Sequence, residues 1–121
     1  MPGSTTQPAQ HLWTSMREVR WSPEEKALAR RVFELALKHE LDQTIQAAKA
    51  RAAKVKDPSE LWDLEHWLTR RRNDIDRKYD YRYSVLPYVF AVLVREGRVS
   101  LDDLGELSED KVEFIRRFLQ V

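Results

Sequence analysis

The most apolar stretch of the chain is SVLPYVFAVLVREG at residues 84–97, which carries no charge before Arg95. Apolar residues occupy every side of it at helical spacing, and this predicts a central helix that is buried all round. A buried strand would show the same run of apolar residues, but the sequence offers no second strand for it to pair with. Ser84 is the expected N-cap, Pro87 then falls at the third helical position, and Gly97 supplies the left-handed stop.

A much longer helix is predicted before this one. Ser22 is placed to cap it, Pro23 takes its first position, and Glu25 completes a capping box. No glycine or proline follows until Pro58, so the helix has about 32 residues and a length of ~48 Å. A compact domain of this size has a diameter of roughly 33 Å. The helix therefore extends beyond its own domain.

The long helix carries two apolar stripes on nearly opposite sides. The first stripe consists of Leu28, Val32, Leu35 and Ala36. The second consists of Leu37, Leu41, Ile45, Ala48, Ala52 and Val55. Two stripes need two partners, namely the rest of the chain and a second copy, which predicts an elongated homodimer with an interface that contains Leu41, Ile45 and Ala48. The alternative is a helix broken near His39 that packs both halves internally.

A second amphipathic helix begins with the same pattern, in which Asp57 caps, Pro58 comes first and Glu60 is third. It runs to about Tyr79, and its predicted buried face consists of Leu61, Leu64, Leu68, Ile75 and Tyr79. Beside that face runs a mixed stripe of Trp62, Glu65, Thr69, Arg72 and Asp76. Tryptophan and arginine dominate protein–protein hot spots, so the stripe favours an interface. A partly buried ion pair covered by the chain's own termini is the alternative.

The remaining sequence completes an all-α fold. A single short turn is expected at residues 100–105, and Ser108-Glu109-Asp110 is expected to cap a final amphipathic helix that carries Val112, Ile115, Phe118 and Leu119. Only three glycines are present, which leaves few tight turns. We therefore predict one long N-terminal helix, a second amphipathic helix, a buried central helix and short C-terminal helices. Residues 1–20 are expected to form a disordered tail, and residues 21–121 a single helical domain.

Composition argues against several classes of function. The chain has 21 basic and 20 acidic residues, and this balance disfavours nucleic-acid binding in spite of the arginine run at residues 70–72. The absence of cysteine excludes disulfides and thiolate metal sites and suits a cytoplasmic location. No apolar run is long enough for membrane insertion. His11, His39 and His66 lack metal-binding spacing, and no catalytic pair is visible, so we expect neither an enzyme nor a cofactor.

Several motifs carry a family resemblance. The segments WSPEE, LWDLEHWLTRRRNDIDRKYD and RYSVLPYVFAVLVREG resemble the fluorescence recovery protein family of cyanobacteria, and the similarity runs without gaps over residues 21–121. The resemblance implies an all-helical homodimer without a cofactor. It further implies a protein that binds the photoactivated orange carotenoid protein and speeds its return to the orange form, which ends quenching of the light-harvesting antenna.

The resemblance also implies site residues. It places Ile45 in the dimer interface and Trp62 and Arg72 on the shared functional and dimer surface. Three departures from the family pattern concern the partner surface, namely Glu65-His66 where the family has His-Asp, Tyr88 in place of phenylalanine, and Phe114 in place of lysine. The expected partner-binding residues are Trp62, Glu65, His66, Arg72 and Tyr88, and the expected dimer interface contains Leu41, Ile45, Ala48, Leu61, Trp62 and Arg72. A helical homodimer of the same fold with a different protein client is the alternative.

Overall fold

The computed structural model describes residues 20–121, and within this range the chain forms helices and no strand. The predicted tail, apart from Arg20, and His11 lie outside the described residues. The elements in chain order are α2 (Pro23–Ala53), α3 (Pro58–Lys78), α4 (Leu86–Arg95), the 3-10 helix η2 (Asp102–Leu104) and α5 (Glu109–Gln120). The all-α prediction is confirmed.

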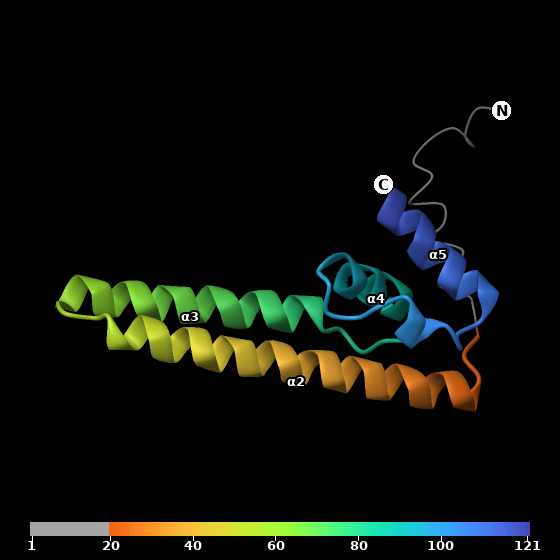
Figure 1. The fold of residues 1–121 in the computed structure, drawn as a ribbon, viewed down its shortest axis with the longest axis horizontal. Helices are drawn as coiled ribbons and strands as arrows, with labels where there is room; N and C mark the ends of the chain where they lie inside the picture. Colours follow the sequence, from red (N-terminus) through yellow and green to blue (C-terminus); the bar gives the residue numbers. More distant parts are fainter. Residues whose placement is uncertain (1–19) are drawn as a thin grey trace.

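Helices α2 and α3 form a long antiparallel hairpin that extends well beyond the other helices (Figure 1). Both predicted helix starts are confirmed: each begins with a complete capping box and a proline in the first turn. At the start of α2, the Glu25 N–H donates to Ser22 Oγ, while the Ser22 N–H donates to the Glu25 carboxylate. The helix continues without interruption past His39 for 31 residues. The alternative of a break near His39 is therefore wrong.

The prediction for the buried face of α3 is wrong in part. Ile75 is buried and Tyr79 is half-buried, but Leu61 and Leu68 are 46% and 40% exposed. The reason is that α3 packs only against α2 over most of its length, as Figure 1 shows. One neighbouring helix covers one side of the apolar stripe and leaves the other side open.

Residues 79–121 form a head that packs against the first half of α2 and shares one core with it. Figure 1 shows α4 lying above the hairpin and α5 rising obliquely from the end of the molecule where α2 begins. The core includes Leu28, Ala29, Phe33 and Ala36 from α2 and, from the head, Leu86, Val89, Phe90, Leu93, Leu104, Val112, Phe114 and Ile115. The first predicted stripe of α2 thus packs internally, except that Leu35 is exposed.

Helix α4 differs from its prediction in two details. Val85 precedes the helix without a side-chain cap, so Ser84 is not the N-cap, and the Arg82 carbonyl accepts the Val85 and Leu86 N–H groups instead. The helix is also not buried all round, because Tyr88 is 45% exposed and Val85 and Val92 are half-buried on the same side.

The two ends of α4 otherwise follow the prediction. Pro87 lies in its first turn, where the missing N–H leaves no hydrogen bond unmade. At the other end Gly97 has φ 78°, and the Arg98 N–H donates to the Leu93 carbonyl while the Gly97 N–H donates to the Val94 carbonyl. This is a Schellman motif, which ends the helix with a residue in the left-handed conformation.

A buried ion pair fastens the start of α5 to the start of α2. Lys111 is completely buried, and its Nζ contacts Glu25 Oε2 at 3.0 Å, the Arg20 carbonyl at 2.7 Å and Ser108 Oγ at 3.1 Å. The Ser108 side chain therefore accepts from Lys111 and does not cap the helix, which corrects the expectation for that residue. Burial raises the pKa of Glu25, but hydrogen bonds from Ser22, Ser108 and Lys111 outweigh burial and leave that pKa below its usual range.

Candidate functional site

The hairpin presents an apolar surface that no described part of the chain covers. The exposed residues of this hairpin surface are Leu41, Ile45, Leu61, Trp62 and Leu68, together with Arg72. Between the two helices lies a hollow of about 300 Å³ whose lining includes Leu41, Thr44, Leu68, Arg72 and Ile75. Ala48, also predicted at the dimer interface, is half-buried. The structure thus brings Leu41, Leu68 and Arg72 together around one hollow.

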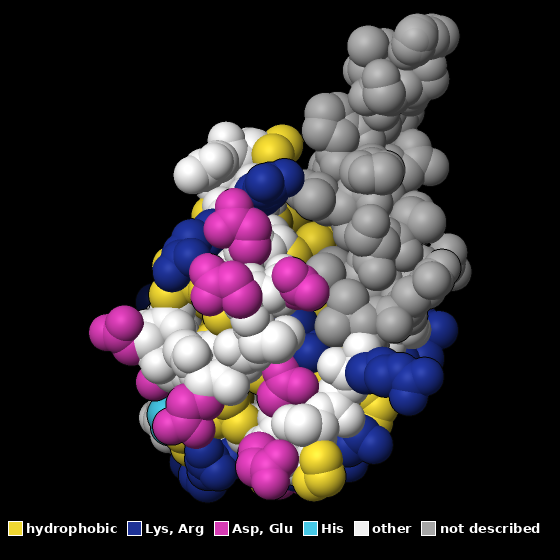
Figure 2. All heavy atoms as spheres, turned by 90° about the vertical axis from the view of Figure 1, so that its right-hand side faces the viewer, with side chains coloured by type: hydrophobic (Ala, Val, Ile, Leu, Met, Phe, Trp, Pro, Cys, Tyr) yellow, Lys and Arg dark blue, Asp and Glu magenta, His cyan; other side chains and the backbone are white. Residues whose placement is uncertain are grey.

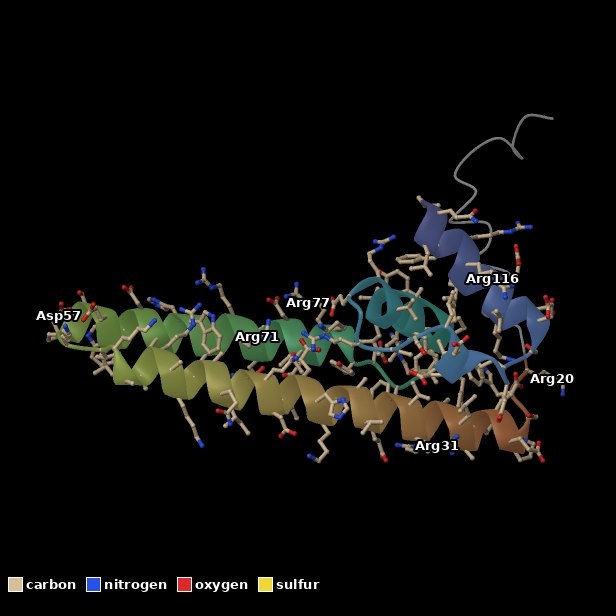
Figure 3. All side chains as sticks on the ribbon, in the orientation of Figure 1. Arg20, Arg31, Asp57, Arg71, Arg77 and Arg116 are labelled. Carbon is tan, nitrogen blue, oxygen red and sulfur yellow. The ribbon has the colours of Figure 1, made fainter. Side chains whose placement is uncertain are left out.

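The arginine run separates into an inward and an outward part. Arg71 lies between α3 and α2 (Figure 3), where its Nε donates to Thr44 Oγ1 at 3.3 Å. Arg70 and Arg72 are exposed, and Arg72 forms no hydrogen bond or ion pair with any residue in the 20–121 range. Arg72 is therefore not half of an ion pair buried against the described chain. Its guanidinium is available to a carboxylate from another molecule.

The displaced carboxylate of the mixed stripe is also exposed. Glu65 accepts a hydrogen bond from Thr69 Oγ1 at 3.2 Å and lies 3.9 Å from His66 Nε2, and both side chains are largely in solvent. Trp62 is the most exposed of these apolar side chains near the hairpin tip. It precedes Arg72 by ten residues, which separates the two by about 15 Å along α3. One copy of the chain therefore does not bring Trp62 and Arg72 into contact.

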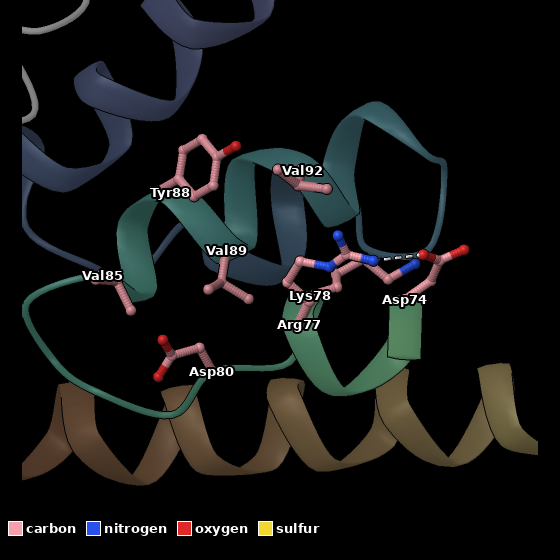
Figure 4. A pocket seen from close by; sticks show the side chains of 8 residues that line it. All are labelled: Asp74, Arg77, Lys78, Asp80, Val85, Tyr88, Val89 and Val92. Atoms are coloured by element: carbon pink, nitrogen blue, oxygen red, sulfur yellow. Dashed lines mark hydrogen bonds and ion pairs between the residues drawn. The ribbon is translucent and has the colours of Figure 1, made fainter. Parts of the chain in front are cut away.

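A second exposed surface lies between the end of α3 and the outer side of α4. This α4 cleft has a volume of about 390 Å³, and Figure 4 shows its lining residues, Asp74, Arg77, Lys78, Asp80, Val85, Tyr88, Val89 and Val92. Its floor is apolar, and its rim is formed by charges, among them the Asp74–Arg77 pair at 2.8 Å. The ring of Tyr88 packs edge-on against Phe118 of α5, with the ring centroids 5.3 Å apart. The cleft is suited to an apolar side chain from a partner.

The sequence analysis missed a buried carboxylate at the junction of hairpin and head. Glu40 is 1% exposed, and its oxygens lie 2.8 Å from Lys78 Nζ, 3.1 Å from Arg98 Nε and 2.7 Å from Tyr79 Oη. Burial and the hydrogen bond to Glu40 raise the pKa of the Tyr79 phenol above its usual range. One signal was present: Glu40 continues the spacing of Ala29, Phe33 and Ala36 on the buried side of α2.

The departure at Phe114 concerns the core and not the surface. Phe114 is buried with Val112 and Ile115 in the head, so an aromatic side chain there adds to the packing of α5. Tyr88, the departure in α4, is in contrast at the surface of the cleft. Of the three departures, Glu65-His66 and Tyr88 therefore remain able to touch a partner.

The described surfaces offer apolar contacts and charged groups. Among residues 20–121 no group of three or more His, Cys, Asp or Glu side chains is arranged to hold a metal ion, and His39 and His66 are exposed. No helix in the same range is both long and apolar enough to cross a membrane. Figure 2 shows carboxylates interspersed with Lys and Arg at the end where α5 begins. Residues 102–113, which lead into and begin α5, contain six Asp and Glu residues.

Comparison with known proteins gives concordant matches. The family described as "Photoprotection regulator fluorescence recovery protein" matches residues 21–118. The fluorescence recovery protein of Synechocystis sp. is 37% identical over 99 residues, which cover 82% of this chain and 91% of that protein. The structures of the fluorescence recovery proteins of Fremyella diplosiphon and Synechocystis sp. PCC 6803 each match with a TM-score of 0.80 and 35% identity. Both matches cover 84% of this chain and all of the other chain.

Proposed function

Because the chain belongs to the fluorescence recovery protein family of photoprotection regulators, we propose that it acts as a non-enzymatic homodimer on the orange carotenoid protein. In this proposal it binds the photoactivated form of that protein and accelerates its return to the orange form. The observation that carries the proposal is the uncovered hairpin surface, which joins apolar side chains to the unpaired Arg72. A cytoplasmic location, expected from the cysteine-free sequence, is part of the same proposal.

The dimer part of the proposal rests on the geometry of the hairpin. Leu41, Ile45, Leu61 and Leu68 present about half of their surface to solvent in a single copy, which is costly unless a partner covers it. A two-fold axis between Ala48 and the middle of α3 would place two hairpins antiparallel. Each Trp62 would then lie opposite the other copy's Arg72 if the axis passes near Trp67, which is five residues from both.

The client part assigns two contact regions. The first is the edge of the dimer that carries Trp62, Glu65, His66 and Arg72, where a tryptophan face lies beside an arginine fork able to bind a carboxylate. The second is the α4 cleft around Tyr88. A client that touches both regions would contact an apolar anchor and a charged clamp at the same time. This is the composition found at protein–protein hot spots.

The decisive experiment mixes the full chain with photoactivated orange carotenoid protein and follows the return of the orange colour. Acceleration at low stoichiometry is the expected result. Trp62→Ala should weaken client binding by roughly 2 kcal/mol or more while the helices stay folded. His39→Ala, an exposed change on α2 away from both contact regions, serves as the matched control. No acceleration at any stoichiometry would overturn the carotenoid-protein proposal.

The alternative client is favoured by one observation, the displaced carboxylate at Glu65-His66. A shift of one position rotates a side chain by about 100° around the helix, so the carboxylate points away from the place where the family has it. The double change Glu65→His with His66→Asp returns the family order. If the unaltered chain binds the carotenoid protein weakly and this double change restores binding, the native client is a different protein. If the double change has no effect, the displacement is without consequence.

A further inference from the structure

We propose that Glu40 is a positioning residue, which fixes the orientation of the head on the hairpin and so sets the spacing between the hairpin surface and the α4 cleft. The name Glu40 cluster is used below for the side chains that meet at this carboxylate, namely Glu40, Arg71, Lys78, Tyr79, Glu96 and Arg98.

The buried carboxylate of Glu40 meets three cations and one phenol. Lys78 Nζ and the Tyr79 hydroxyl donate to it at 2.8 and 2.7 Å. Arg98 Nε, which donates to Glu96, forms an ion pair with it at 3.1 Å, and Arg71 Nη2 lies 3.7 Å away. A buried charge is tolerated only when such partners replace water. All of these partners are groups that donate, so the geometry at the two oxygens is directional.

The partners come from the end of α3, from the connection to α4 and from the residues that follow α4. Lys78 is the last residue of α3, Tyr79 opens the connection to α4, and Arg98 follows the stop at Gly97. Lys78 Nζ also reaches Glu96 at the end of α4, at 2.8 Å, and Arg98 Nε reaches the same oxygen at 3.0 Å. One side chain of α2 is thereby linked to both ends of the α4 segment.

The same cations also line the surface hollows. Lys78 lines the α4 cleft, and Arg71 lines the hollow of the hairpin surface. Arg98 lines a third hollow of about 290 Å³ beside α2. Each of these three cationic residues therefore belongs both to the wall of a hollow and to the Glu40 cluster. A change in the Glu40 cluster moves the walls of surfaces that are far apart in the sequence.

Apolar packing alone would not fix this geometry. The head contacts α2 through apolar side chains such as Ala29, Phe33 and Ala36, and the hydrophobic effect that favours these contacts is not directional. A buried ion cluster adds little net stability compared with apolar side chains of the same volume. What it adds is a single arrangement in which every donor is satisfied. This is the property of a positioning group.

The consequence for binding rests on the proposed function. A client that contacts both the hairpin surface and the α4 cleft needs them at one spacing, since each wrong spacing reduces the binding-competent fraction of the protein. Loss of the Glu40 carboxylate should therefore weaken client binding without removing any residue that touches the client.

The geometric claim can be tested without any client. The chain has no cysteine, so Lys54→Cys at the hairpin tip and Glu106→Cys in the head give two unique spin-label sites. Labelled chain is diluted into excess unlabelled chain, and the distance distribution between the labels is measured by pulsed electron paramagnetic resonance. In Glu40→Gln the distribution should become at least about twice as broad, because several arrangements become populated. An unchanged width overturns the proposal.

The matched control is Asp42→Asn, which removes a carboxylate two residues away. Asp42 is exposed and, among residues 20–121, pairs only with Lys38 on its own helix, at 3.0 Å. The distance distribution between the labels in Asp42→Asn should equal that of the unaltered chain. Circular dichroism establishes that each variant is folded. If Glu40→Gln does not fold, Arg98→Gln decides the question, because it removes one partner of the cluster and should broaden the distribution in the same direction.

The binding claim has its own readout. Glu40→Gln should bind photoactivated carotenoid protein about tenfold more weakly, with unchanged dimerisation, whereas Asp42→Asn should bind normally. Equal binding by Glu40→Gln and Asp42→Asn refutes the link to the client. If the unaltered chain does not bind the carotenoid protein at all, the proposed function fails, and the distance measurement still decides the role of Glu40.

Discussion

Replacing Ile45 by glutamate should convert a dimer of this protein into folded monomers. Ile45 lies on the hairpin surface and is 49% exposed in one copy, so a partner can cover about half of it. Full burial of an isoleucine side chain is worth about 1.5–3 kcal/mol, and covering the exposed half is therefore worth about 0.7–1.5 kcal/mol. A two-fold dimer repeats the contact, which gives about 1.5–3 kcal/mol for the pair.

The charge adds a larger penalty than the lost contact. Ile45→Ala removes only the apolar contact, so it should raise the dissociation constant about 10–150-fold. Glutamate at the same place brings two like charges into an apolar interface, and the desolvation of each costs several kcal/mol. The dissociation constant for Ile45→Glu should therefore rise by more than about a thousandfold.

Analytical ultracentrifugation at tens of micromolar protein measures both variants against the unaltered chain. Leu35→Glu is the matched control, because Leu35 is an exposed apolar residue on the same helix that lies outside the hairpin surface. Circular dichroism should show the same helix content for all chains. The reasoning is refuted if Ile45→Glu remains a dimer with a dissociation constant within tenfold of the unaltered chain, or if the unaltered chain is itself a monomer.

Three further predictions concern stability, each measured as the free energy of unfolding in urea. Pro87→Ala should change it by no more than about 1 kcal/mol, because Pro87 is in the first turn of α4; a gain near 3 kcal/mol would contradict that placement. Gly97→Ala should cost about 1–2 kcal/mol through its φ of 78° alone, since an added Cβ meets nothing within 4 Å. Gly105→Ala, at φ −65° but with its added Cβ 3.3 Å from the Asp102 carbonyl oxygen, measures a steric cost without the left-handed backbone. Acid should destabilise the fold, because burial raises the pKa values of Glu25 and Glu96 but their hydrogen bonds outweigh it and leave both below the usual range. The stability that these carboxylates supply is complete above their unfolded pKa of about 4.3 and is lost as the pH falls through the lower folded values; a urea midpoint that stays constant down to pH 2 would contradict this.

The helix starts were predictable because a cap is a local structure. A capping box and its proline lie within the four residues from the N-cap to N3. The hydrogen bonds of the box therefore need no distant group. The stop at Gly97 is equally local. These signals placed α2 and α3 within a few residues of their observed bounds. The start of α4 has no side-chain cap, and it was the one that the sequence misplaced.

Burial was harder to predict than secondary structure. Periodicity identifies the apolar side of a helix but not what covers it, so Leu61 and Leu68 were assigned to a buried face although both are exposed. Helix α4 has no polar side, and nothing in its sequence marks the exposed side around Tyr88. For the buried charges the reason is distance along the chain. Lys78 and Tyr79, two partners of Glu40, lie 38 and 39 residues away, and Lys111 follows Glu25 by 86 residues.

The ion pair between Glu25 and Lys111 has a consequence for the order of assembly during synthesis. Chains are made from the N-terminus at about 5–20 residues per second, and the hairpin is complete in sequence by residue 78. Its helices are neighbours along the chain, so they can pair while the rest is still being made. The head cannot close until Lys111 has emerged, because this residue joins the last helix to the first turn of α2. On the ribosome the hairpin surface is therefore complete before the head, so the proposed dimer contact would become available earlier than the α4 cleft.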